Sequence, residues 1–245
     1  MSLDVSERVG VRRRSRLPTG IEALDRVLGG IPSGSVILIS GKPGSGFDIF
    51  AQQMLYFAAY SGACNVLYVT ADHPTYDVES EMIERGWAID TLLSNNRWVF
   101  LDAYSVRSNV IKQVVGAKAL TELFRSLPSL IKEGTWLAVD TLTSFLEIIR
   151  YEDALEILVD LMSCVREKGG LHLLLIVEGL HDEKTVTTLM RMADGFINFT
   201  LDSRYAEPVG RITIGKLRML NHVRRVIPYR IVENGILIET TTRIS

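Results

Sequence analysis

The sequence lacks the features of a secreted, disulfide-built or membrane-spanning protein. It has only two cysteines, Cys64 and Cys164, which are far apart and outside any CxxC motif, so zinc and redox-motif interpretations have no support. No run of about 18 apolar residues could span a bilayer. The N-terminus shows no apolar segment followed by a cleavage pattern. We therefore expect reduced, buried thiols and a cytoplasmic location.

The chain also has little net charge, but its basic residues are unevenly distributed. The 27 Lys and Arg residues nearly balance the 29 Asp and Glu residues, giving a net charge of −2. Residues 1–18 nevertheless carry a net charge of +3 and residues 204–230 a net charge of +6. These segments could contact nucleic acid, or equally an acidic surface of the same chain or a neighbouring subunit. The candidate contacts to nucleic acid are Arg12, Arg13, Arg14, Arg224 and Arg225.

What the sequence does contain is enough apolar material for one large core. The chain has 245 residues, of which 47% are hydrophobic. We expect residues 1–16 to be a flexible basic N-terminal segment and residues 17–245 to be a single domain.

Apolar runs of strand length alternate with amphipathic segments along most of the chain. The predicted strands are 35–40, 65–70, 98–101, 136–139 and 171–177, and the predicted helices are 21–28, 48–60, 75–85, 109–131, 152–168 and 185–193. Uniformly apolar strands alternating with helices indicate a parallel sheet covered on both faces. The later runs 196–201, 211–217, 226–231 and 236–238 have short turns between them, which predicts a mixed or antiparallel edge. The fold class is therefore α/β.

Two details of the helices are also predicted. Thr19 is a candidate N-cap of the first helix, with Glu22 completing a capping box. The helix over 109–131 is expected to be interrupted near Pro128.

A glycine-rich loop follows the first apolar strand and precedes a helix, which is where a phosphate-binding loop belongs. Its residues are Gly41, Lys42, Pro43, Gly44, Ser45 and Gly46. The usual lysine position of such a loop holds Phe47, and the usual Ser/Thr position holds Asp48. Phe47 supplies no charge, and Asp48 adds negative charge where phosphates would lie. Phe47 could plug the pocket or pack beneath the loop, while Lys42 is a candidate substitute for the missing lysine.

The order of these features resembles that of KaiC-like proteins of the RecA superfamily. The segment PTGIEALDRVLGGIPSGSVILISGKPGSG (18–46) carries the resemblance, which continues in WLAVDTLTSF (136–145), MADGFINF (192–199) and TIGKLRML (213–220). The resemblance implies a RecA-like P-loop NTPase fold, with a twisted, mostly parallel sheet and ATP at the strand ends. It also implies a homo-oligomer, hexameric or dimeric, or a hetero-oligomer with an active family member.

Some functional positions of that family match this chain and others do not. Asp140 falls on the Walker B aspartate, and Lys216 and Arg218 fall on the Lys-x-Arg pair that reaches a neighbouring subunit's γ-phosphate. The pair of catalytic acidic residues falls on Asp72 and His73, so either side chain is only a candidate base. The departures at Phe47 and Asp48 remove the phosphate-binding lysine and the magnesium-binding hydroxyl.

These departures favour a pseudo-ATPase that acts as a regulatory or assembly subunit, with weak or no ATP binding and without efficient hydrolysis. One alternative is a weak ATPase that uses Lys42, or Lys216 and Arg218 of a neighbour. Another is a nucleic-acid-binding recombinase paralogue. ATP and Mg²⁺ are expected as ligands only if the altered loop still binds them. No separate metal site is predicted, because no histidine has partners at metal-ligand spacing.

Overall fold

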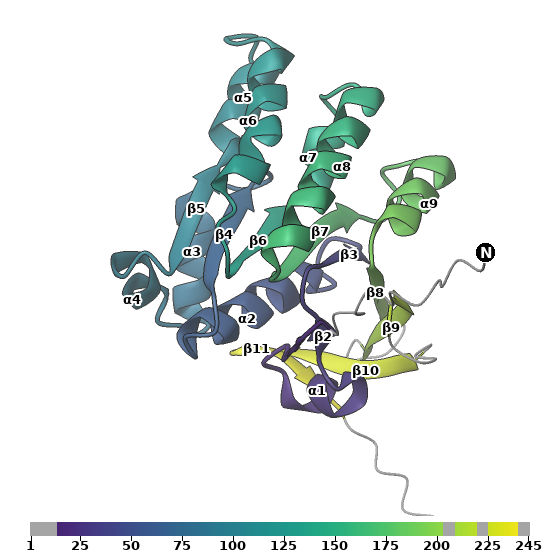
Figure 1. Ribbon diagram of the computed structural model, residues 1–245. Coiled ribbons are helices and arrows are strands. Elements are labelled where there is room, and N and C mark those ends of the chain that lie inside the picture. The colour runs from purple at the N-terminus through teal and green to yellow at the C-terminus, as the bar shows by residue number, and fades with distance from the viewer. Residues whose placement is uncertain (1–13, 203–208, 220–224, 240–245) are drawn as a thin grey trace, which may run out of the picture.

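The computed structural model describes residues 14–202, 209–219 and 225–239, and its centre is a mixed β-sheet (Figure 1). In the described residues the sheet has nine strands in the order β11-β10-β9-β8-β3-β7-β6-β4-β5. Six strands are parallel: β3 (Ser35–Gly41), β4 (Asn65–Thr70), β5 (Trp98–Asp102), β6 (Thr135–Asp140), β7 (Leu171–Val177) and β8 (Gly195–Asp202). The antiparallel edge consists of β9 (Val209–Leu217), β10 (Arg225–Val232) and β11 (Gly235–Ile238). The predicted α/β class with an antiparallel C-terminal edge is confirmed.

Strand β3 shows why the sheet needs helices on both faces. Every residue of β3 is buried. Val36 and Leu38 belong to one hydrophobic cluster, whereas Ile37 and Ile39 belong to the other. Because successive side chains of a strand point to opposite faces, this alternation places an apolar core on each side of the sheet.

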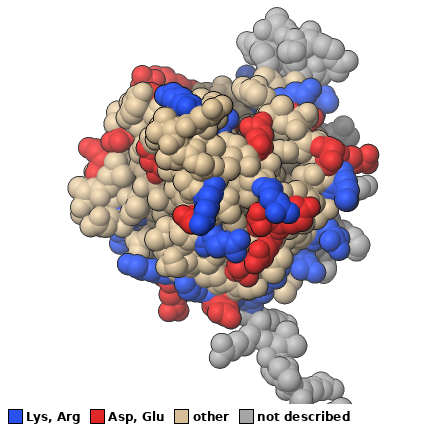
Figure 2. Space-filling model, turned by 90° about the horizontal axis from the view of Figure 1, so that it is seen from above, with Lys and Arg blue, Asp and Glu red and all other residues tan. Residues whose placement is uncertain are grey.

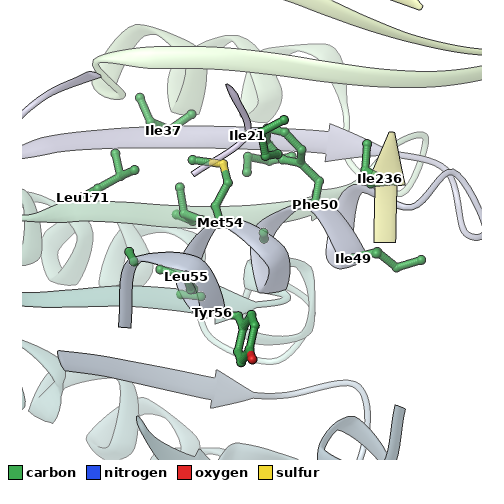
Figure 3. Close-up of a cluster of buried hydrophobic side chains, with 14 of the residues drawn as sticks. Ile21, Ile37, Ile49, Phe50, Met54, Leu55, Tyr56, Leu171 and Ile236 are labelled. Carbon is green, nitrogen blue, oxygen red and sulfur yellow. The ribbon is translucent and has the colours of Figure 1, made fainter. Parts of the chain in front are cut away.

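Helix α2 fills the core on one face. The four helices on this side are α1 (Glu22–Leu28), α2 (Phe47–Tyr60), α3 (Thr75–Glu84) and α4 (Ile89–Ser94). Phe50 and Met54 of α2 are fully buried against Ile37 and Leu171 of the sheet (Figure 3). Their spacing of four residues keeps both side chains on the helix face that meets the sheet.

The remaining helices cover the opposite face (Figure 1). They are α5 (Ala103–Ile111), α6 (Ala117–Leu130), α7 (Leu142–Leu146), α8 (Tyr151–Lys168) and α9 (Glu183–Met192). Phe124 of α6 and Phe145 of α7 stack with ring centroids 4.6 Å apart. This pair joins the helix layer that covers β4, β6 and β7.

The prediction of one helix over residues 109–131 is wrong. The chain forms α5 and α6, separated by residues 112–116, where Gln113 has a φ of 60°. Pro128 does not interrupt the helix but lies inside the last turn of α6. The Lys168 ammonium of α8 donates to the carbonyl oxygens of Pro128 and Ile131, so contacts with another helix satisfy the helix end.

The predicted capping box of the first helix is also wrong. Helix α1 has Ile21 at its N-cap, without a side-chain cap hydrogen bond. The Asp25 carboxylate instead accepts hydrogen bonds from the backbone N–H groups of Thr19 (2.7 Å) and Gly20 (3.2 Å). Asp25 therefore organises the turn that the sequence assigns to Thr19 and Glu22.

The N-terminal end of the described chain pairs with the body of the domain. Strands β1 (Arg16–Leu17) and β2 (Ile31–Pro32) form a short antiparallel ribbon.

The two cysteines are free thiols, but only Cys64 is buried, and burial raises its pKa to about 12. Cys164 is half-buried, contrary to the expectation that both would be buried. None of the helices in the described ranges has the length and apolarity needed to cross a membrane.

Candidate functional site

A cavity of about 190 Å³ lies where the carboxyl ends of β3, β4 and β6 approach one another. Most of the predicted site residues line it: Pro43, Gly44, Phe47, Asp48, Asp72, His73 and Asp140. Ligands of open α/β sheets commonly bind at this edge. The structure therefore brings together three segments that are separated in the sequence: the glycine-rich loop with the start of α2, residues 72–73 after β4, and Asp140 at the end of β6.

The glycine-rich loop curls back over the end of β3. The Ser45 N–H donates to the Lys42 carbonyl (3.0 Å), and Lys42, Pro43 and Gly44 are exposed. A Cβ atom at Gly41 would lie 2.5 Å from Ser45 Oγ, so only glycine fits beneath this turn. Gly46 has a φ of 76° and forms the N-cap of α2. The loop thus has the strand–loop–helix geometry that the sequence predicts.

Phe47 is the first residue of α2 and is buried, with only 5% of its surface exposed. A Cβ at Gly41 would approach the Phe47 ring to 2.8 Å. The side chain belongs to the hydrophobic cluster on the α2 face and also lines the cavity. Phe47 therefore both packs beneath the loop and forms part of the cavity wall.

Asp140, the last residue of β6, is buried at the base of the cavity. Its Oδ2 atom accepts a hydrogen bond from the Tyr68 hydroxyl at 2.5 Å. The pKa of Asp140 is raised to about 7. Burial is the main cause, and the nearby carboxylates of Asp48, Asp72 and Glu81 act in the same direction, while the Tyr68 hydrogen bond lowers the pKa. The peptide bond from Asp140 to Thr141 is cis.

Asp72 lies next to Asp140 but is held by its own hydrogen bonds. The Thr141 hydroxyl donates to one of its carboxylate oxygens at 2.9 Å, and the Ser144 hydroxyl donates to the other. Arg107 of α5 lies 3.9 Å from the same carboxylate. His73 lines the cavity with an exposed side chain.

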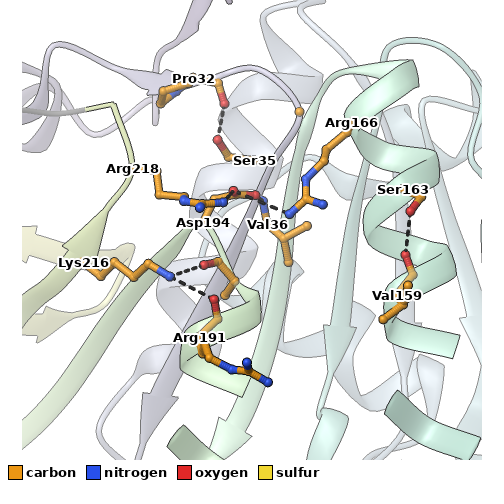
Figure 4. Close-up of polar contacts among 12 residues, drawn as sticks. Pro32, Ser35, Val36, Val159, Ser163, Arg166, Arg191, Asp194, Lys216 and Arg218 are labelled. Atoms are coloured by element: carbon orange, nitrogen blue, oxygen red, sulfur yellow. Dashed lines mark hydrogen bonds and ion pairs between the residues drawn. The ribbon is translucent and has the colours of Figure 1, made fainter. Parts of the chain in front are cut away.

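Lys216 and Arg218 are not among the residues that line this cavity. Figure 4 shows them beside Arg191 and Asp194. The Lys216 ammonium donates to the carbonyl oxygens of Met190 (2.9 Å) and Ala193 (2.6 Å) at the end of α9. Burial, followed by the neighbouring Arg218 charge, lowers the Lys216 pKa. In this chain Lys216 therefore caps a helix whose carbonyl groups carry partial negative charge. The predicted action of this pair on a neighbouring subunit stays a prediction.

Arg218 belongs to a second cavity, of about 420 Å³, at the amino end of β3. Its guanidinium lies 3.4 Å from Asp194, and that of Arg166 lies 3.9 Å from the same carboxylate. Asp194 also accepts a hydrogen bond from the Val36 N–H at 3.1 Å. Arg166 and Arg218 therefore both pair with a buried acid (Figure 4), and Arg14 also lines this cavity.

The candidate nucleic-acid residues are only partly covered by the structure. Arg12, Arg13 and Arg224 lie outside the described residues, and Arg225 begins β10. Arg14 donates to the carbonyl oxygens of Ser33 (3.4 Å) and Gly34 (3.2 Å). On the face shown in Figure 2, basic and acidic side chains lie beside one another rather than in a continuous basic field.

Several polar residues were not predicted from the sequence as site residues, among them Gln52, Glu81 and Asp194, which line these cavities, and Tyr68, which donates to Asp140. Gln52 could have been found, because it is four residues after Asp48 and therefore on the same face of α2. Asp194 lies within the MADGFINF segment that carries the family resemblance. Tyr68 and Glu81 carry no local signal of this kind.

The fold and the position of the loop define the class of protein. A mostly parallel sheet with flanking helices, a glycine-rich loop after β3 and an aspartate at the end of β6 are the arrangement of a RecA-like P-loop NTPase domain. The chain belongs to the KaiC ATPase family, whose model matches residues 17–243.

Individual relatives agree with this assignment. The chain is 26% identical to a UPF0273 protein of Thermotoga maritima over 235 residues, which covers 91% of this chain and 95% of the relative. Its structure is similar to that of a KaiC-like protein of Pyrococcus horikoshii, with a TM-score of 0.74 and 22% identity over 93% of this chain and 100% of the other. It is also similar to the flagellar accessory protein FlaH of Methanocaldococcus jannaschii, with a TM-score of 0.71 and 18% identity over the same shares.

Proposed function

We propose that this KaiC-family chain is a pseudo-ATPase: it binds ATP weakly or not at all, lacks efficient hydrolysis and acts as a regulatory or assembly subunit. The observation that carries the proposal is Phe47, a buried apolar ring at the position of the phosphate-binding lysine. A phosphate loop uses its lysine to reach the β- and γ-phosphates, and a phenylalanine has neither the charge nor a hydrogen-bond donor.

The charge of the cavity supports the same conclusion. Asp48, Asp72, Glu81 and Asp140 line it, and no lysine or arginine is among its described lining residues. A triphosphate brought into this cavity would meet carboxyl groups where a nucleotide site supplies cations. Such like-charge contacts disfavour binding most strongly in a partly buried site, where water screens them less.

The residues available for chemistry support weak hydrolysis at most. The base position of the family holds Asp72, whose two carboxylate oxygens already accept hydroxyl hydrogen bonds. Loss of positioned catalytic and charge-stabilising groups costs on the order of 10²–10³ in rate for each group. A chain that keeps the fold while losing these groups is suited to binding partner subunits.

The proposed partners are copies of this chain, as a hexamer or dimer, or an active member of the same family. The similar structure from Methanocaldococcus jannaschii is that of a flagellar accessory protein. An accessory role for this chain agrees with the altered loop, because subunit contacts do not require turnover.

Calorimetric titration with Mg·ATP tests the proposal, using the wild type and the double variant Phe47→Lys, Asp48→Thr. We expect no saturable heat for the wild type and measurable binding for the double variant, because the variant restores the lysine and the hydroxyl. Saturable ATP binding by the wild type that disappears in Lys42→Ala would contradict the proposal and favour a weak ATP site based on Lys42. A steady wild-type ATPase that is lost in Asp72→Ala or Asp140→Ala would also contradict it.

A further inference from the structure

The cavity at the carboxyl ends of the strands contains more negative charge than its surroundings neutralise. Asp140 is bound by Tyr68, and Asp72 is bound by Thr141, Ser144 and Arg107. The side-chain carboxylates of Asp48 and Glu81 have no hydrogen bond or ion pair with another described residue.

Asp48 and Glu81 face the cavity from different helices. Asp48 is half-buried in the first turn of α2, and Glu81 is exposed on α3. Both are lining residues. They are therefore positioned to act as counter-ions for a positive group that enters between the two helices.

Gln52 provides a second, independent observation. Its side chain lines the cavity from α2, one turn after Asp48, and only 2% of its surface is exposed. Its Oε1 atom is buried and has no hydrogen-bond partner. Buried acceptors in folded proteins are nearly always paired, so an unpaired acceptor at a cavity wall points to a ligand that carries a donor.

The size of the cavity restricts the ligand further. A volume of about 190 Å³ is below the roughly 300–1,000 Å³ of sites that enclose drug-sized molecules. A cavity of this size suits a single charged head group. The described residues contain no group of three His, Cys, Asp or Glu side chains placed to hold a metal ion, which favours an organic cation.

We propose that this cavity binds an ammonium or guanidinium head group, with Asp48 and Glu81 as its counter-ions and Gln52 Oε1 as its hydrogen-bond acceptor. The proposal deepens the proposed function and rests on it, since a site without bound nucleotide is free for another ligand. The polarity of the family's nucleotide site is then reversed from anion binding to cation binding. The head group can belong to a free amine or to a Lys or Arg side chain of a partner subunit.

Calorimetric titration with methylguanidinium and ethylammonium, the isolated head groups, tests this inference. We expect saturable binding of at least one head group to the full-length wild type. Glu81→Gln is expected to weaken it about tenfold or more, because it removes a counter-ion. Glu84→Gln is the matched control, since Glu84 is exposed on the same helix outside the cavity, and it should leave binding unchanged.

A second variant tests the acceptor. Gln52→Met removes Oε1 while keeping an unbranched side chain, and it is expected to weaken head-group binding. Spermidine and the peptide Gly-Arg-Gly distinguish the two sources. Tighter binding of spermidine than of the peptide indicates a free amine, and the reverse order indicates a protein side chain.

Two results would overturn the inference. The first is no saturable binding of either head group, and Mn²⁺ binding that depends on Glu81 would then indicate a metal site instead. The second is equal binding by the Glu81→Gln and Glu84→Gln variants. Mg·ATP titrated into the same wild-type preparation keeps the two proposals separate. Tight ATP binding contradicts the proposed function, whereas absence of both ligands contradicts only the cation inference.

Discussion

The two ends of strand β3 carry cavities of opposite character. At the amino end, Arg166 and Arg218 surround Asp194, whose carboxylate also accepts the Val36 N–H. At the carboxyl end, Asp48 and Glu81 face a cavity that has no lysine or arginine among its described lining residues. The carboxylate at the first end is therefore paired within the chain, whereas the carboxylates of Asp48 and Glu81 at the second end have no lysine or arginine counter-ion in the described part of the cavity wall.

This difference separates structural charge from charge that is available to a ligand. A buried acid that is paired and hydrogen-bonded contributes to the stability of the folded chain, and removing it leaves its partners unsatisfied. Carboxylates gathered without partners raise the free energy of the folded state unless a proton or a cation neutralises them. Four substitutions test this contrast, beginning with the largest expected effect.

Asp194→Ala is expected to lower the free energy of unfolding by about 3 kcal/mol, because it leaves the buried Val36 N–H without an acceptor and separates two arginines from their counter-charge. Urea denaturation provides the measurement. Arg166→Ala is the control, and its effect should be about 1 kcal/mol or less because 38% of the Arg166 side chain is exposed. Equal effects of the two variants would show that Asp194 is not the centre of this cluster.

Asp140→Asn is expected to stabilise the protein by about 2 kcal/mol near pH 8, since it removes an ionisable group that burial disfavours and keeps an acceptor for Tyr68. The pKa of Asp140 is raised in the folded state to about 7 from the ordinary value of 3.8. The stability contributed by the protonated carboxyl is thus complete below about pH 4 and is lost as the pH rises through about 7.

Urea denaturation of the wild type and Asp140→Asn across this pH range measures the effect. The stabilisation should grow between about pH 4 and pH 7 and then level off. Glu84→Gln should show no such growth, because Glu84 lies outside the cavity. Destabilisation by Asp140→Asn near pH 8 would mean that the cavity does not oppose the charge of Asp140.

Lys216→Met is expected to lower the free energy of unfolding by about 1 kcal/mol, because it removes the ammonium that caps the last carbonyl groups of α9. Thermal unfolding is a suitable measurement. Lys184→Met is the control, since Lys184 is exposed near the N-terminal end of the same helix and its loss should be neutral. An unchanged melting temperature in Lys216→Met would argue against a capping role.

Glu81→Gln is expected to change the free energy of unfolding by about 0.5 kcal/mol or less, because the side chain is exposed and forms no hydrogen bond or ion pair with the residues that the structure describes. Chemical denaturation without ligand measures this effect. A larger destabilisation would show that Glu81 has a structural role, and its effect on cation binding would then need a different variant.

The sequence predicts the frame of the site because the frame is encoded locally. The apolar run before Gly41, the glycine loop and the helix after Gly46 are contiguous, and Asp140 directly ends a buried strand. Strand ends in a parallel sheet meet at one edge, so the approach of Asp72 and Asp140 follows from their positions after β4 and β6.

The partners of these residues could not be predicted in the same way. The Tyr68–Asp140 hydrogen bond joins residues 72 positions apart, and the contact of Asp194 with Val36 spans 158 positions. Such pairs depend on the three-dimensional arrangement of strands rather than on local spacing. The error at Pro128 has the same cause, because Lys168, which supports the end of α6, comes from α8.

One paired titration tests the central claim, that the family's nucleotide site has changed from binding an anion to binding a cation. Calorimetry would compare Mg·ATP with methylguanidinium on the wild type and on the double variant Phe47→Lys, Asp48→Thr. We predict that the wild type binds methylguanidinium and not ATP, and that the double variant has the opposite preference. Binding of ATP but not methylguanidinium by the wild type would contradict the account.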